Sequence, residues 1–214
     1  MFKFTTIKLL RAAVIAAVYS TVTIFLAPLS YGPVQIRFAE ALTILPLLFP
    51  EAVIGVTIGC LISNIFNGMW TDMVFGTLAT FAAAVLTYYI GKLFKLNNSA
   101  KQKKDETAII SNDMTVVKER KGGAFLGALP PVLINAIVVP IIIFSFIQED
   151  MAKINIFTAN SFLLYILGFV SILIGQAIAV YGIGIPFYFG IKKGMNIYSA
   201  QSLKRKPEKS GNDE

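Results

Sequence analysis

Long hydrophobic runs fill most of this 214-residue sequence, and 56% of its residues are hydrophobic. Because a transmembrane helix needs about 20 mainly apolar residues, several of these runs are close to the length of a membrane span. The pattern is typical of a polytopic membrane protein rather than of a soluble domain with one core. We therefore predict an all-α membrane protein, a bundle of six transmembrane helices. The helices are expected over about 8–28, 38–49, 51–66, 71–94, 123–146 and 158–191.

The second predicted helix is short for a span, and prolines interrupt the region that should continue it. Pro46 lies near the end of this helix, and Pro50 lies directly after it. Proline lacks a backbone N–H and disrupts a helix, so the second and third helices are expected to form a broken pair within the bilayer. Backbone groups freed by such a break must be buried in protein or line a polar cavity.

Positive charge is concentrated in three segments of the chain. Of the 19 Lys and Arg, all but Arg37 and Lys153 lie in the first 11 residues, between 92 and 121, or from 192 onwards. The positive-inside rule places all three segments in the cytoplasm, together with both termini. The net charge of +7 is thus explained by membrane topology, without nucleic-acid binding.

The same composition divides the chain into four parts. Residues 1–95 hold the first four helices, and residues 122–192 hold the fifth and sixth. Residues 96–121 are rich in Asn, Ser, Lys, Gln, Asp and Glu with few aromatic side chains, so we predict a flexible, basic cytoplasmic linker. Residues 193–214 form a basic cytoplasmic tail.

Several kinds of chemistry are excluded by residues that the sequence lacks. The chain has no histidine and a single cysteine, Cys60, in an apolar run where a packed thiol is expected. Histidine metal ligands and Ser-His or Cys-His catalytic pairs are therefore absent. There is also no Gly-x-x-x-x-Gly-Lys-[Ser/Thr] phosphate loop. The chain is therefore predicted to bind or pass a solute, without enzymatic activity, cofactor or metal.

Four charged side chains interrupt the apolar part of the first four predicted helices. They are Arg37, Glu40, Glu51 and Asp72. Ionisable groups at membrane depth are costly unless paired or solvated, so they are candidates for function. Arg37 and Glu40 lie one helical turn apart and could pair on one face, either as part of a binding site or to order the outer loop. Glu51 is explained by a helix start, where the dipole favours a carboxylate.

Amide and aromatic side chains are expected on the outer halves of the helices. They are Asn64, Asn67, Trp70, Asn135 and Asn160. Amides, a ring face and a carboxylate such as Asp72 suit a planar, hydrogen-bonding, heteroaromatic ligand better than a bare ion. Taken singly, Trp70 is explained by default as an interfacial belt residue.

The first predicted helix carries two rows of small residues at helix-contact spacing. The rows are Ala12 with Ala16, and Ala13 with Ala17. Such a smooth face lets another helix approach closely, either within this bundle or on a partner protein. A similar row, Gly55 and Gly59, lies on the third helix, where packing inside the bundle is expected.

The sequence resembles a known family along four segments. These are residues 11–19, 31–46, 64–68 and 72–80, and the run Gln-Ile-Arg-Phe-Ala-Glu from Gln35 to Glu40 is the most specific part. The segments resemble the QueT family, whose members are assigned as substrate-binding membrane subunits for queuosine precursors in energy-coupling-factor transporters. The resemblance is strong over the first four predicted helices and rests on pattern over the last two.

The resemblance implies an architecture, partners and a location. Subunits of this class are six-helix bundles of the cell membrane that bind their vitamin on the outer half. Small residues of the first helix dock them on a membrane-embedded coupling protein driven by two cytoplasmic ATPases. The resemblance thus assigns partner docking to Ala12, Ala13, Ala16 and Ala17, and it accounts for the missing phosphate loop.

The implied ligand is a 7-deazaguanine derivative, whose hydrogen-bonding groups can be matched to the sequence. Its ring N–H and exocyclic amine form a donor pair that Glu40 could accept, and its keto oxygen needs a donor from Arg37, Asn64 or Asn67. A cationic aminomethyl precursor would favour a second carboxylate, such as Asp72, or an aromatic face. A neutral nitrile precursor would need neither, and the sequence leaves this choice open.

Two other kinds of function remain open at the level of sequence. The first is a self-sufficient secondary carrier coupled to protons or sodium, although the later helices show no relay of carboxylates. The second is a membrane assembly protein without transport, whose polar groups merely pair with one another. A carrier should work alone on an ion gradient, and no solute should stabilise an assembly protein.

Overall fold

The computed structural model describes residues 5–30, 36–68, 70–106, 122–152 and 161–204. Side chains are described in these ranges except at 95–106, 142–152, 161–164, 196 and 198–204. Throughout these ranges all regular secondary structure is helical, with no β-strand. The elements are α1 (Thr6–Phe25), α2 (Ala27–Ser30), η1 (Phe38–Leu47), α3 (Ala52–Asn67), η2 (Asp72–Gly76), α4 (Thr77–Glu106), α5 (Gly122–Gly127), α6 (Leu129–Ala152), α7 (Ser161–Ala177), η3 (Ile178–Gly184) and α8 (Ile185–Lys204). Of these, η1 is a 3₁₀ helix, and η2 and η3 are π-helical.

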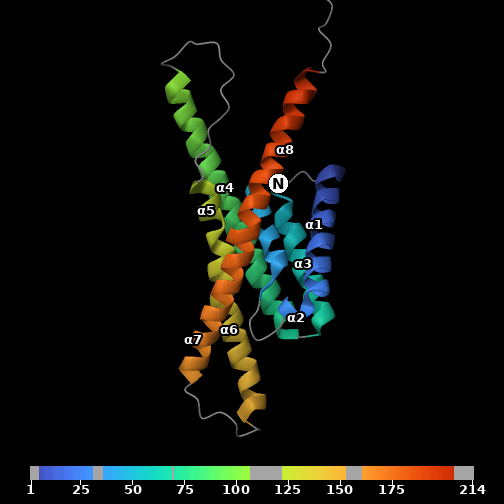
Figure 1. Cartoon of the computed structure of the whole chain (residues 1–214), viewed down its shortest axis with the longest axis vertical. Helices are drawn as coiled ribbons and strands as arrows, with labels where there is room; N and C mark the ends of the chain where they lie inside the picture. Colours follow the sequence, from blue (N-terminus) through green and yellow to red (C-terminus); the bar gives the residue numbers. More distant parts are fainter. Residues whose placement is uncertain (1–4, 31–35, 69, 107–121, 153–160, 205–214) are drawn as a thin grey trace, which may run out of the picture.

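The helices run back and forth between the two ends of an elongated bundle (Figure 1). The start of α1 and the last turns of α4 and α8 point towards one end, while α2, the end of α6 and the start of α7 lie at the other. The segments rich in positive charge therefore begin or end on the same side of the bundle. The assignment of that side to the cytoplasm stays a prediction.

Four stretches of the described chain are long and apolar enough to cross a membrane. They are Thr6–Phe25, Asp72–Phe94, Gly122–Ile141 and Tyr165–Met195. Two shorter apolar helices, Phe38–Leu47 and Ala52–Asn67, complete the bundle. At 1.5 Å per residue, α3 is only about 24 Å long, against about 30 Å for the hydrocarbon core. The count of six spans thus stays a prediction, whereas the all-helical membrane architecture is confirmed.

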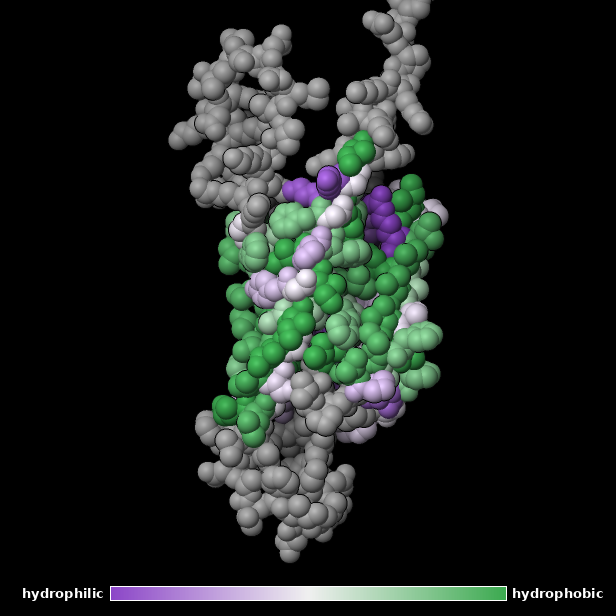
Figure 2. Space-filling model, in the orientation of Figure 1, coloured by the Kyte–Doolittle hydropathy of each residue, from purple (hydrophilic) through white to green (hydrophobic). Residues whose placement is uncertain are grey.

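The outer surface of the bundle is mainly apolar. Figure 2 shows hydrophobic residues over the middle of the visible face and the strongly hydrophilic ones towards its ends. Large side chains such as Phe25, Leu78 and Leu167 are well exposed on different helices. A soluble protein rarely exposes so much contiguous apolar surface, so this face is suited to contact with lipid.

The short helix η1 is the buried centre of the structure. Every residue from Ala39 to Leu47 is buried. Thr43 Oγ1 donates to the Glu40 carbonyl oxygen at 2.6 Å, and Pro46 has no N–H to contribute to a regular α-helical pattern. The backbone of this broken segment is therefore enclosed by protein, as the membrane requires of irregular structure.

Two helices extend further than the sequence pattern predicted. The helix α4 continues to Glu106, beyond its predicted end at about residue 94 and into the segment predicted as a linker at 96–121. Similarly, α8 continues to Lys204, well into the predicted tail. Lys, Gln, Glu and Ala are good helix formers, so a polar segment can prolong a helix already nucleated by an apolar one. Residues 107–121 and 205–214 lie outside the described residues.

Close packing of α1 on α3 depends on two glycines. A Cβ atom at Gly55 would lie 2.8 Å from the Ala12 carbonyl oxygen, and one at Gly59 would lie 2.7 Å from the Cβ of Tyr19. Ala12 and Ala16 are buried on the facing side of α1. The packing interpretation of the Gly55 and Gly59 row is thereby confirmed.

This packing predicts that Gly55→Ala destabilises the protein by about 1–3 kcal/mol, because the new methyl group would press on backbone that cannot move aside. The matched control is Gly190→Ala in α8, where a Cβ atom would meet nothing within 4 Å. That change should be neutral or stabilising by up to about 1 kcal/mol, since alanine is the better helix former. Thermal unfolding in detergent measures both, and equal effects would contradict the close approach.

The break between α5 and α6 leaves backbone groups that other helices satisfy. Pro131 has no N–H to reach the Gly127 carbonyl oxygen four residues earlier, and Thr87 Oγ1 of α4 donates to that oxygen at 3.0 Å. The Tyr181 hydroxyl donates to the Phe125 carbonyl oxygen at 3.1 Å. These bonds tie α5 to α4 and η3 around the break.

Candidate functional site

A buried ion pair joins the start of η1 to η2. Arg37 stands just before η1 with extended backbone (φ −89°, ψ 93°), and its Nη2 lies 3.2 Å from Asp72 Oδ2. Both side chains are buried, and Arg37 Nε also donates to the Ser30 carbonyl oxygen at 3.4 Å. The suggested pair of Arg37 with Glu40 is therefore wrong: because Arg37 lies outside the helix, the one-turn spacing does not apply to it.

Glu40 lies at the centre of the bundle and is 0% exposed. Its Oε1 accepts a hydrogen bond from the Tyr19 hydroxyl of α1 at 2.6 Å, a short contact. Its Oε2 has no hydrogen-bond partner among the described residues. Asn135 of α6 is also buried and lies near the same carboxylate. Glu40 thus has one carboxylate oxygen that is hydrogen-bonded and one that has no hydrogen-bond partner among the described residues.

Asn64 supports the ion pair from α3. In a π-helical turn such as η2 the hydrogen-bond pattern is loosened, and Asn64 Nδ2 donates to the Asp72 carbonyl oxygen at 2.8 Å. The same amide lies 3.4 Å from Cys60 Sγ, which Thr80 Oγ1 approaches at 3.3 Å. Asn64 therefore fixes the backbone that carries Asp72, and Cys60 is the packed thiol that the sequence predicted.

The other candidate ligand-binding residues lie apart from this cluster or outside the described structure. Asn67 is half-buried in the last turn of α3. Trp70 is 61% exposed, as expected of a residue near an interface. Asn160 lies outside the described residues. The structure therefore gathers five of the predicted residues into one buried group, which we call the polar cluster: Arg37, Glu40, Asn64, Asp72 and Asn135.

Glu51 belongs to a separate contact at the opposite end of η1. It immediately precedes α3, and its carbonyl oxygen accepts the Gly55 N–H at 3.2 Å. Its Oε1 also pairs with Arg11 Nη1 at 3.2 Å, and Arg11 stacks over the Phe49 ring at 5.1 Å. The helix-start explanation of Glu51 is consistent with this position, and its ion pair with α1 is an addition.

The two alanine rows of α1 face in different directions. Ala12 and Ala16 are buried against α3, whereas Ala13 and Ala17 are exposed on the outer face of the helix. Surface docking on a separate protein would therefore use Ala13 and Ala17. The contribution of Ala12 and Ala16 is to hold α1 on α3.

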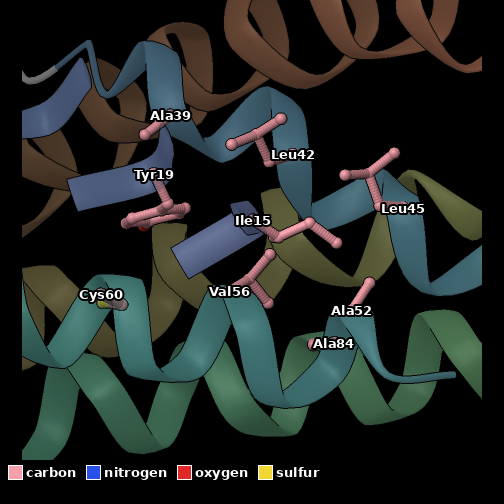
Figure 3. Close-up of a cluster of buried hydrophobic side chains, with 9 residues drawn as sticks. All are labelled: Ile15, Tyr19, Ala39, Leu42, Leu45, Ala52, Val56, Cys60 and Ala84. Carbon is pink, nitrogen blue, oxygen red and sulfur yellow. The ribbon is translucent and has the colours of Figure 1, made fainter. Parts of the chain in front are cut away.

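The polar cluster is joined through Glu40 to Tyr19, a residue outside the cluster to which sequence reasoning gave no role. Tyr19 is 1% exposed, and Figure 3 shows its ring between η1 and α3, close to Ala39 and Cys60. Helical spacing could have indicated it, because Tyr19 follows Ala12 and Ala16 by seven and three residues and so shares their inner face. Its partner Glu40, 21 residues away, could not be found from spacing.

The cluster is suited to recognising a polar molecule through hydrogen bonds. Arg37 and Asp72 compensate each other, which leaves Glu40 as an acceptor and Asn135 as both donor and acceptor. No group of three or more His, Cys, Asp or Glu side chains in the described chain could hold a metal ion. The chemistry offered is hydrogen bonding in a water-poor interior, where matched donors and acceptors discriminate strongly.

Comparison with known proteins identifies the family. The family model described as "QueT transporter" matches residues 9–193. A relative from Lactococcus lactis subsp. cremoris (strain MG1363), named "Queuosine precursor transporter QueT", is 36% identical over 97 residues. That alignment covers 44% of this chain and 57% of the relative, so it spans a little more than half the relative's length. No solved structure is a significant match.

The family match confirms the resemblance seen along residues 11–80. It also agrees with the four long apolar helices, which are those of a multi-pass membrane protein. Because the family model covers most of the chain, this protein belongs to the QueT transporter family, a family of transporters rather than of enzymes.

Proposed function

We propose that this chain is the substrate-binding membrane subunit of an energy-coupling-factor importer that takes up a queuosine precursor across the cell membrane. The precursor, a 7-deazaguanine derivative, binds in the outer half of the bundle at the polar cluster. The subunit docks on a coupling protein of the membrane, and two separate ATPases supply the energy. The relative named as a queuosine precursor transporter supports the choice of substrate.

The observation that carries the proposal is the open carboxylate oxygen of Glu40. A buried carboxylate normally has partners for its oxygens, because an unpaired acceptor in a protein interior is costly. Glu40 Oε2 is fully buried and has no partner among the described residues. A 7-deazaguanine base brings the missing donors, its ring N–H and exocyclic amine.

The neighbouring side chains suit the rest of the base. Asn135 lies near Glu40 and can donate its amide N–H to the keto oxygen of the ligand. Asn64, by contrast, already uses its amide on the Asp72 backbone, which favours a supporting role. Because Glu40 is completely enclosed, the ligand reaches it only when neighbouring elements move apart.

The main alternative is a secondary carrier that needs no partner. A proton-coupled carrier would need acidic groups along its path, yet the sequence has no Asp or Glu between Glu119 and Glu149, nor between Asp150 and Glu208. The absence of a phosphate loop is compatible with ATPases on separate chains. Both observations favour the coupled importer.

The two functions are separated by uptake into vesicles. We expect labelled 7-deazaguanine to enter only when the chain is reconstituted with a coupling protein, two ATPases and ATP. The chain alone should bind the ligand without accumulating it, whatever proton or sodium gradient is imposed. Accumulation by the chain alone on an ion gradient would contradict the proposal and support the carrier.

The exposed alanine row provides a test of docking. Replacing Ala13 and Ala17 together with leucine should abolish ATP-driven uptake, because bulky side chains prevent the close approach of another helix. Ligand affinity should change less than about twofold, since neither residue touches the polar cluster. The matched control is Ala82→Leu, at an exposed position on α4. Unchanged uptake in the double variant would exclude this row as the docking face.

A further inference from the structure

The contact between Tyr19 and Glu40 is more than a core contact. The Tyr19 hydroxyl holds Oε1 at 2.6 Å, while Oε2 of the same carboxylate has no partner among the described residues. A phenylalanine would fill the same core volume without a buried polar pair, and a buried carboxylate left half-satisfied is a cost to folding. The buried hydrogen bond between Tyr19 and Glu40 is therefore explained better by a functional role than by packing alone.

Tyr19 is itself held firmly by the backbone around it. A Cβ atom on Gly59 would lie 2.7 Å from the Cβ of Tyr19, so α3 lies directly against the base of this side chain. The Tyr19 carbonyl oxygen accepts a bond from Thr23 Oγ1 at 2.9 Å. In Figure 3 the ring is enclosed between η1 and α3. Because the Tyr19 ring is enclosed, its hydroxyl can hold the Glu40 carboxylate in one plane.

We propose that Tyr19 is a positioning residue that orients Glu40 so that Oε2 meets the hydrogen-bond donors of the ligand. This proposal rests on the proposed function. According to it, Tyr19 enables the site to distinguish ligands with two adjacent hydrogen-bond donors from ligands with one. A fixed carboxylate accepts a pair of donors only in the correct geometry. A carboxylate that can rotate accepts one donor almost as well as two.

The test compares two ligands on two matched variants. 7-Deazaguanine offers the ring N–H and the exocyclic amine, whereas 7-deazahypoxanthine lacks the amine. Tyr19→Phe removes only the hydroxyl that contacts Glu40. The control, Tyr181→Phe, removes a hydroxyl bonded to the Phe125 carbonyl oxygen at the α5–α6 break. Dissociation constants are measured calorimetrically, and thermal unfolding without ligand confirms that each variant is folded.

We expect Tyr19→Phe to weaken 7-deazaguanine binding about tenfold and 7-deazahypoxanthine binding much less. The preference for 7-deazaguanine over 7-deazahypoxanthine therefore falls. Tyr181→Phe should leave both constants unchanged. Equal weakening of both ligands by Tyr19→Phe, or no change in either, would overturn the positioning role.

A second measurement applies even if Tyr19→Phe lowers stability. If Tyr19 acts through Glu40, its substitution should have almost no further effect on affinity in a Glu40→Met background, where the Tyr19 hydroxyl has no acceptor at this position. If Tyr19→Phe weakens ligand binding as much in that background as in the wild type, the positioning role of Tyr19 is overturned. A wild-type chain that binds neither ligand would overturn the proposed function together with this inference, whereas binding with unchanged preference in Tyr19→Phe would overturn the inference alone.

Discussion

Replacing Glu40 with glutamine is expected to weaken the binding of a 7-deazaguanine ligand by more than about tenfold. A hydrogen bond to a charged group contributes about 1.5–3 kcal/mol, and tenfold in affinity corresponds to about 1.4 kcal/mol. Glutamine also replaces one acceptor oxygen with an N–H₂ donor, which opposes the donors of the ligand. Isothermal titration of the purified chain in detergent measures the change.

The same substitution should leave the ligand-free protein nearly as stable as the wild type. Glutamine removes a buried charge whose second oxygen is unpaired, and its carbonyl oxygen can still accept the Tyr19 hydroxyl. The matched control is Glu51→Gln, which alters a buried glutamate paired with Arg11 rather than with the polar cluster. Its ligand affinity should stay within about twofold of the wild type. If Glu40→Gln and Glu51→Gln bind equally well, Glu40 is not the ligand acceptor.

Breaking the Arg37–Asp72 pair should produce the largest loss of stability. Removal of one partner of a buried ion pair leaves an uncompensated charge and costs about 3–5 kcal/mol. Arg37→Met and Asp72→Asn are each expected to lower the free energy of unfolding by this order. The double variant should be less destabilised than the sum of the two, because it leaves no unpaired charge.

The control for this cycle is the ion pair at the other end of η1. Arg11 is half-exposed, so Arg11→Met should cost no more than about 1 kcal/mol. Denaturant or thermal unfolding in mild detergent measures all four variants. Strictly additive losses for Arg37 and Asp72 would mean that the two side chains are not energetically paired.

Much of the helical architecture follows from the sequence because apolar runs and prolines are local signals. The α3 boundaries, Ala52–Asn67, lie within one residue of the range predicted from its apolar run. The interruption around Pro46 and Pro50 predicted the irregular, enclosed segment that became η1. The ends of α4 and α8 were harder to place, since polar helix formers prolong a helix without an apolar pattern.

The candidate site was only partly predictable, because its pairings join distant parts of the chain. The cost of burying charge singled out Arg37, Glu40 and Asp72, and the structure places all three in one cluster. Spacing on one helix suggested the wrong partner for Arg37, since its backbone is extended and Asp72 approaches from η2. Nothing local to Tyr19 indicated that its hydroxyl would reach Glu40.

The same geometry explains how one chain serves both binding and docking. One face of α1 holds Ala12, Ala16 and Tyr19 against the interior, while a neighbouring face, about 100° around the helix axis, exposes Ala13 and Ala17. A ligand that contacts Glu40 therefore lies one hydrogen bond away from the helix proposed to meet the coupling protein. Separate tests of the two faces are possible because they share a helix but no side chains.

The central claim is that this chain, without partners, binds a 7-deazaguanine at Glu40. The most direct measurement is thermal unfolding of the purified chain in detergent with 7-deazaguanine precursors, guanine, riboflavin, thiamine and biotin. A ligand at 100 times its dissociation constant stabilises the native state by about 2.7 kcal/mol. We predict a rise in unfolding temperature that is selective for the deazaguanines and is lost in Glu40→Gln. No rise with any deazaguanine, or an equal rise with an unrelated vitamin, would contradict the account.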